Sequence, residues 1–168
     1  PLRETAGASC FVGSPPGSRG AGQVLYEYLF PDTSSVYYAP GLILVGPGVE
    51  VADICGGGCA GITADLSDTN IFVNMSSANS QSFSSGAFNG IHIFDSLGVV
   101  PAFTSVAINV ATNLAGSDAS RVSFDANNIY LNFQGLSIGV ANVVSVDIEA
   151  VPEPGTLLLL GSGISALV

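Results

Sequence analysis

The sequence predicts an all-β fold: a single antiparallel, jelly-roll-like β-sandwich with an extended N-terminal arm and an apolar C-terminal tail. Short segments of alternating apolar and polar residues recur between turn-forming residues, a pattern typical of sandwiches. The 168 residues include 21 glycines and nine prolines, which disfavours long helices. Hydrophobic residues make up 48% and charged residues 10%, so the chain is not disordered and can build a core.

The length favours one domain, and the composition changes towards both ends. Residues 1–22 are rich in glycine, proline and serine and are expected to form an irregular arm; any signal peptide is expected to have been removed already. The sandwich domain is expected over residues 23–150, and a tail over residues 151–168. The uncharged stretch 155–168 would be about 21 Å long as a helix, too short to span a bilayer, which needs roughly 20 residues.

In the first half of the domain, alternation and turns predict five strands. Residues 24–30 place Val, Tyr, Tyr and Phe on one face and Leu, Glu and Leu on the other. Turns are expected at residues 46–48, which read Gly-Pro-Gly, and at residues 67–70, which read Ser-Asp-Thr-Asn. The expected strands are residues 24–30, 42–45, 49–54, 62–66 and 71–75.

The second half continues the same pattern after a Ser/Asn-rich loop expected over residues 76–85. Its expected strands are residues 88–94, 103–110, 121–124, 129–133 and 143–150. The total is about ten short strands, which favours a sandwich, although the strand order cannot be deduced. The core is expected from the apolar faces of residues 24–30, 88–94, 103–110 and 143–150.

The charged residues are mostly acidic: 13 acids stand against three arginines and no lysine, for a net charge of −10. Such a surface repels a phosphate backbone, so we expect no nucleic-acid partner. Without lysine, a P-loop and a Schiff-base nucleophile are also excluded.

The three cysteines, Cys10, Cys55 and Cys59, allow one disulfide and leave one thiol. Three glycines separate Cys55 from Cys59 and tolerate the tight backbone of a small ring, so we expect a Cys55–Cys59 disulfide. Cys10 would then be free or form an intermolecular bridge. A zinc site would require all three cysteines and His92 to converge, which their spacing does not support, and no cofactor is expected.

No catalytic residue can be identified from the sequence. A serine nucleophile needs a base, and His92 is the only histidine of the chain. On a strand, His92 and Phe94 face one way and Ile91 and Ile93 the other, so we expect a solvent-facing histidine. The acids are scattered over turns and define no glycosidase pair. We therefore expect that the protein is not an enzyme.

Acidic turns leave two interpretations open. Asp65, Asp68 and Asn70 could offer oxygen ligands to calcium at a sandwich edge. The alternative is a turn whose side chains bond their own backbone, which the absence of EF-hand spacing favours. Residues 117–120 and 125–128 are interpreted as hairpin connections.

The tail begins with Val151-Pro152-Glu153-Pro154, followed by a small residue and an apolar run. In this position the tetrapeptide resembles the PEP-CTERM sorting signal of exopolysaccharide-producing bacteria. A common class of PEP-CTERM passenger domain is similar to residues 23–160, in the segments 24–28, 103–106, 111–114, 120–124, 129–136 and 143–147. The resemblance implies that Pro152, Glu153 and Pro154 form the sorting motif, recognised by a membrane exosortase, and that the protein is exported to the envelope or extracellular matrix. The arginine cluster that ends the family's tail is missing here.

These observations predict a secreted structural protein of the cell surface or extracellular matrix that self-assembles into a matrix or filament. A tail strand could pair with an open sheet edge of a neighbouring subunit, and such a head-to-tail contact propagates. The assembly residues would be Thr156, Leu157, Leu158, Leu159, Leu160, Ile164, Leu167 and Val168. The alternatives to an assembly strand are a tail that inserts into a membrane and a tail that packs on its own sandwich. The alternative function is a carbohydrate-binding module with exopolysaccharide as partner, for which the chain has tyrosines but no tryptophan.

Overall fold

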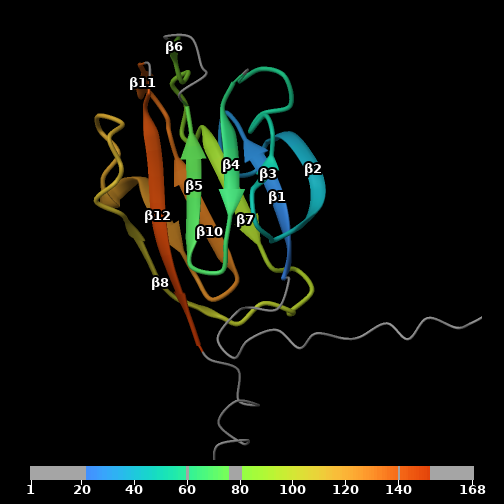
Figure 1. The fold of residues 1–168 in the computed structure, drawn as a ribbon. Coiled ribbons are helices and arrows are strands. Elements are labelled where there is room, and N and C mark those ends of the chain that lie inside the picture. Colours follow the sequence, from blue (N-terminus) through green and yellow to red (C-terminus); the bar gives the residue numbers. More distant parts are fainter. Residues whose placement is uncertain (1–21, 60, 76–80, 140, 152–168) are drawn as a thin grey trace, which may run out of the picture.

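In the computed structural model, residues 22–59, 61–75, 81–139 and 141–151 are described, and this part of the chain contains twelve β-strands and one 3-10 helix but no α-helix. The elements are β1 Gln23–Leu29, β2 Val36–Leu44, β3 Val49–Val51, β4 Thr63–Leu66, β5 Asn70–Asn74, β6 Gln81–Ser82, β7 Gly90–Phe94, β8 Phe103–Ile108, η1 Ala119–Arg121, β9 Val122–Phe124, β10 Asn128–Asn132, β11 Ser137–Ile138 and β12 Val143–Ala150. Two antiparallel sheets pack face to face, so the predicted β-sandwich is confirmed (Figure 1).

Each large sheet has five strands. One has the order β2-β1-β7-β10-β9 and the other β3-β4-β5-β12-β8, while β6 and β11 form a small ribbon. The chain crosses between the two large sheets after β2, β5, β7, β8 and β10, passing through β6 on the second crossing and through β11 on the last. This repeated crossing gives the sandwich its jelly-roll-like character, and the order of strands could not be deduced from local patterns.

The core lies between the sheets and follows the period of two that strands impose. In β1, Val24, Tyr26 and Tyr28 are buried and face the core, while Leu25 and Glu27 are only half-buried on the outer face. The four segments expected to supply the core do so, but β4, β5 and β10 contribute as well. Buried side chains from these three strands are Ala64, Leu66, Ile71, Val73, Ile129 and Leu131.

Several strands differ from their predicted bounds. β2 begins at Val36, six residues before the predicted start at residue 42, and its pairing with β1 contains register shifts around Tyr28. β3 ends at Val51 instead of residue 54 because the chain then turns into the disulfide loop. The ribbon of β6 and β11 was not predicted, since two-residue strands carry no periodic signal.

The turn over residues 125–128 connects β9 and β10 as a hairpin, as predicted. Residues 117–120 do not: they lie between β8 and β9, which belong to different sheets. There Asp118 caps η1, accepting a hydrogen bond from the backbone N–H of Ser120.

The sandwich has two distinct ends. β1 begins and β12 finishes at one end, while the β6–β11 ribbon lies at the other (Figure 1). No helix in the described part of the chain is long and apolar enough to cross a membrane. The N-terminal arm up to residue 21, Cys10 included, and the tail over residues 152–168 lie outside the described residues.

Candidate functional site

The predicted Cys55–Cys59 disulfide is present, with the two Cα atoms 5.5 Å apart. It closes the loop between β3 and β4, and Cys55 is buried at 4% exposure. Asp53 orders the start of this loop, because its Oδ1 accepts a hydrogen bond from the backbone N–H of Cys55 at 3.0 Å.

Two of the three glycines between the cysteines, Gly56 and Gly58, lie close against neighbouring side chains. Gly56 has a φ of +69°, and a β-carbon at this position would overlap the ring of Tyr38 from β2. A β-carbon on Gly58 would lie 3.2 Å from Cys55 Sγ and 3.3 Å from Tyr37 Oη. The small loop can therefore lie directly against the two adjacent tyrosines of β2.

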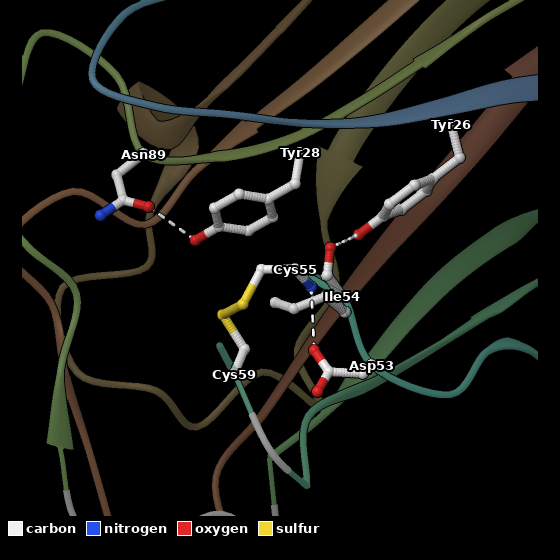
Figure 2. Close-up of a disulfide and its surroundings, with 7 residues drawn as sticks. All are labelled: Tyr26, Tyr28, Asp53, Ile54, Cys55, Cys59 and Asn89. Atoms are coloured by element: carbon white, nitrogen blue, oxygen red, sulfur yellow. Dashed lines mark hydrogen bonds between the residues drawn. A yellow bond between two sulfur atoms is a disulfide. The ribbon is translucent and has the colours of Figure 1, made fainter. Parts of the chain in front are cut away.

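Two further tyrosines, Tyr26 and Tyr28 of β1, lie next to the disulfide loop (Figure 2). The hydroxyl of Tyr26 donates to the carbonyl of Ile54 at 2.7 Å, and that of Tyr28 donates to Asn89 Oδ1 at 2.6 Å. Burial is the main cause that raises the pKa of both phenols. They therefore stay neutral hydrogen-bond donors and hold β1, the disulfide loop and the start of β7 together.

A pocket of about 170 Å³ opens beside the disulfide. Its aromatic lining comes from Tyr28, Phe30, Tyr37 and Phe83, and its polar lining includes Gln81, Ser84 and Asn89. Tyr37 is 59% exposed and stands edge-on to two of the other rings, with ring centroids 6.3 Å from Tyr28 and 6.5 Å from Phe30. This is the most site-like feature of the described chain, and sequence reasoning missed it.

Its residues come from the β1 and β2 region, the disulfide loop, the segment around β6, the start of β7 and β11, so no local motif could reveal it. The sequence gives only a weak indication of this pocket. Two tyrosine-rich strands lie on either side of a turn, and a cysteine pair follows shortly after.

Asp53, Cys55 and Cys59 have their ligand-type atoms within 4.8 Å of one another. The two sulfurs are bonded to each other, however, and a disulfide supplies no thiolate to a metal. His92 lies elsewhere, on the outer face of the β2-to-β9 sheet, so the described members of the zinc set considered from the sequence, Cys55, Cys59 and His92, do not come together.

The expectation that His92 faces open solvent is wrong. The residue is on the predicted outer face but only 8% exposed. Its ring stacks between Phe94, at a centroid distance of 4.5 Å, and Tyr130, at 4.2 Å. Nε2 lies 3.0 Å from Asn128 Oδ1 and Nδ1 lies 3.4 Å from Glu27 Oε2. Tyr130 covers the histidine because it is its direct cross-strand partner.

Many acidic side chains cap their own turns. Oδ1 of Asp32 accepts from the backbone N–H of Ser34 at 2.9 Å, and the corresponding atom of Asp125 accepts from Asn127 at 2.8 Å. Asp95, buried at 7% exposure, accepts three backbone N–H groups from the loop after β7. These carboxylates are used to order loops.

The β4–β5 turn is closed by Ser67, whose hydroxyl accepts the backbone N–H of Asn70 at 3.1 Å. The Asn70 amide donates to Ser145 Oγ and to Asp147 Oδ1 across the sheet. Burial and, second, the Glu50 carboxylate raise the pKa of Asp65. Calcium binding by Asp65, Asp68 and Asn70 stays a prediction, and the hydrogen bonds favour the plain turn.

The sorting motif Pro152, Glu153 and Pro154 and the tail residues from Thr156 to Val168 lie outside the described residues. No protein-family model, curated protein or solved structure matches the chain.

Proposed function

We propose that the protein is a non-enzymatic structural component of the bacterial cell surface or extracellular matrix, and that it self-assembles by strand addition at β2. The observation that carries the proposal is the free edge of this strand. β2 is nine residues long and ends its sheet, with β1 as its partner on one side and no described strand on the other. A long exposed edge strand is a template for pairing with another chain.

The backbone pattern identifies the free segment of this edge. Val45 donates its N–H to the carbonyl of Gly22 at 2.9 Å, so these two residues form a hydrogen-bonded pair. In an antiparallel ladder such pairs alternate with pairs that are not hydrogen-bonded. The N–H and C=O groups of Leu42 and Leu44 therefore point away from β1, towards the open edge.

The side chains of the same residues are suited to an apolar partner strand. Leu42 is 48% exposed and Leu44 is 58% exposed. Pro40 limits the acceptor segment on one side, because proline lacks an N–H and protects the edge from pairing. The chain itself contains a fitting donor in the tail, whose leucine run over residues 157–160 is uncharged.

An apolar contact also suits the charge of the molecule. Copies with a net charge of −10 repel one another, so self-association needs a contact that buries apolar surface without adding acids. Both the tail from Gly155 onward and the β2 segment from Gly41 to Leu44 lack ionisable residues.

The remaining chemistry supports a scaffold more than an enzyme. Acids order turns, and His92 is covered by two rings. The disulfide suits an oxidising compartment and thus export, while processing by an exosortase-type enzyme remains a proposal based on the sequence resemblance.

Deletion of residues 155–168 tests the proposal. The full chain is expected to form filaments or higher oligomers visible by negative-stain microscopy and sedimentation, and the shortened chain to remain monomeric. Replacing Leu157, Leu158, Leu159 and Leu160 by serine keeps the length of the tail and is expected to have the same effect. Assembly of the shortened chain at the rate of the full chain would show that the tail is not the assembly strand.

A further inference from the structure

We propose that the pocket beside the disulfide binds a single uncharged sugar ring, the terminal or branch residue of a glycan. The pocket lies at the sandwich end that carries the β6–β11 ribbon, away from the point where β12 finishes (Figure 1). This proposal goes beyond the structural role, because the pocket uses Tyr37 near the start of β2 and not the acceptor segment at Leu42 and Leu44.

The aromatic walls provide flat apolar faces at a corner. Tyr37 stands at 68° to the ring of Tyr28 and at 83° to that of Phe30. Tyr28 is fixed by its hydrogen bond to Asn89, whereas Tyr37 remains largely exposed and available to a ligand. Such faces suit the C–H faces of a sugar ring, since aromatic side chains combine apolar area with little conformational freedom.

Three polar side chains of the lining are not used by the described part of the fold, whereas Ser82 is hydrogen-bonded to Ser137. No described residue forms a hydrogen bond with the side chains of Tyr37, Gln81 or Ser84, while Asn89 is committed to Tyr28 and to the carbonyl of Ser84. Hydroxyl and amide groups both donate and accept hydrogen bonds, as the hydroxyls of a sugar require. A few placed polar groups among aromatic walls are the usual composition of a small-molecule site.

Charge and size narrow the ligand class. No aspartate, glutamate, arginine or histidine lines the pocket, so a charged ligand would find no counter-ion there. The net charge of −10 further disfavours anions. The volume of about 170 Å³ is below the range of sites that enclose a drug-sized ligand, which suits one ring of a longer molecule.

The walls of the pocket are also ordered before any ligand binds. The disulfide, the Tyr28–Asn89 hydrogen bond and the hydrogen bond from Asn89 Nδ2 to the Ser84 carbonyl hold three of its walls. A site that is ordered before binding loses less conformational entropy on binding.

The test uses the full chain in its unassembled form, purified by size exclusion and labelled with ¹⁵N. The probes are the methyl glycosides of D-glucose, D-galactose, D-mannose and N-acetyl-D-glucosamine, with D-glucuronate as the charged control. At least one neutral glycoside is expected to shift the amide signals of Gly58 and Ser84 in a saturable way, and glucuronate is expected not to. Tyr37→Ala should weaken binding at least tenfold, and Tyr37→Phe by about 2- to 10-fold, the loss of one hydrogen bond. Leu97→Ala, at another exposed apolar residue, should bind as the unchanged chain does.

Three results would overturn the inference: no neutral glycoside shifts these signals, Tyr37→Ala binds as well as the unchanged chain, or a peptide of residues 156–168 shifts them while the sugars do not. The last result would make the pocket a polypeptide site. Because binding is measured on unassembled protein, its failure and a failure of strand addition are separate outcomes.

Discussion

Asp125 illustrates at the scale of one residue how this protein uses its acids. Its Oδ1 accepts the backbone N–H groups of Asn127 and Asn128 at 2.8 and 2.9 Å, and the Asn128 amide donates to both of its oxygens. The backbone hydrogen bond from Asn127 and the side-chain hydrogen bond from Asn128 lower the pKa of Asp125. Asn128 also contacts His92, so this carboxylate supports the hairpin and the aromatic stack together.

Asp125→Asn should therefore destabilise the fold at neutral pH and remove part of its acid sensitivity. The pKa is lowered in the folded state, so the stabilisation is fully present above the unfolded value of about 3.9. It is lost as the pH falls through the folded value. In urea unfolding, the midpoints of the two chains should differ at pH 7, and the difference should shrink as the pH falls below the unfolded pKa of about 3.9.

Asp68→Asn is the matched control, because it removes the same charge from another turn where no described residue donates a hydrogen bond to the carboxylate. At pH 7 the urea midpoint of Asp68→Asn should differ less from that of the unchanged chain than the midpoint of Asp125→Asn does. A midpoint difference for Asp125→Asn that does not shrink as the pH falls below about 3.9 would contradict the role assigned to the ionised carboxylate.

At the scale of elements, the disulfide loop packs closely against β2, and this contact requires glycine at Gly56 in the loop. Gly56 and Gly57 both have positive φ values, +69° and +108°, but their surroundings differ. A β-carbon on Gly56 would overlap the ring of Tyr38, whereas one on Gly57 would meet no atom within 4 Å. Substituting Gly57 therefore tests backbone strain alone, whereas substituting Gly56 tests backbone strain together with the contact to Tyr38 of β2.

Gly57→Ala should cost about 1–2 kcal/mol of unfolding free energy, the penalty of an L-residue in the left-handed region. Gly56→Ala should cost about 1–3 kcal/mol more, because the Tyr38 ring must move. Chemical denaturation measures both values, and a double-mutant cycle with Tyr38→Ala should remove the extra cost of Gly56→Ala but leave Gly57→Ala unchanged. Equal costs for the two glycine variants would contradict the contact with Tyr38.

The same elements show how far sequence reasoning reaches. β12 was predicted over its full length and β4, β5 and β10 nearly so, because each combines regular alternation with a clear turn. The first part of β2 was missed because Pro40 and Gly41 interrupt its pattern. His92 was assigned to the correct face but the wrong exposure, since its cover comes from Tyr130 on another strand. The Cys55–Cys59 disulfide was predictable because it is local, and the pocket was not because it joins distant segments.

At the scale of the whole molecule, the two sheets leave unequal edges. β9 and β3 are three-residue edge strands and β8 is a six-residue one, whereas β2 has nine residues. Short edges protect a sheet from pairing with other chains, and a long one with exposed leucines does not. β2 is the longest of the four edges and carries the exposed Leu42 and Leu44, so it is the edge at which we expect strand addition.

Leu44→Lys should block assembly while leaving the sandwich folded. Leu44 is 58% exposed, so the substitution places a charge on the open edge without changing the core, and lysine is a residue that natural edges use against pairing. Val110→Lys is the matched control, because Val110 is 101% exposed in the loop after β8 and the change in net charge is identical. Sedimentation and negative-stain microscopy should find monomers for Leu44→Lys and unchanged assemblies for Val110→Lys, with equal denaturation midpoints. Assembly of Leu44→Lys at the rate of Val110→Lys would mean that the acceptor is a different surface, even if deletion of the tail abolishes assembly.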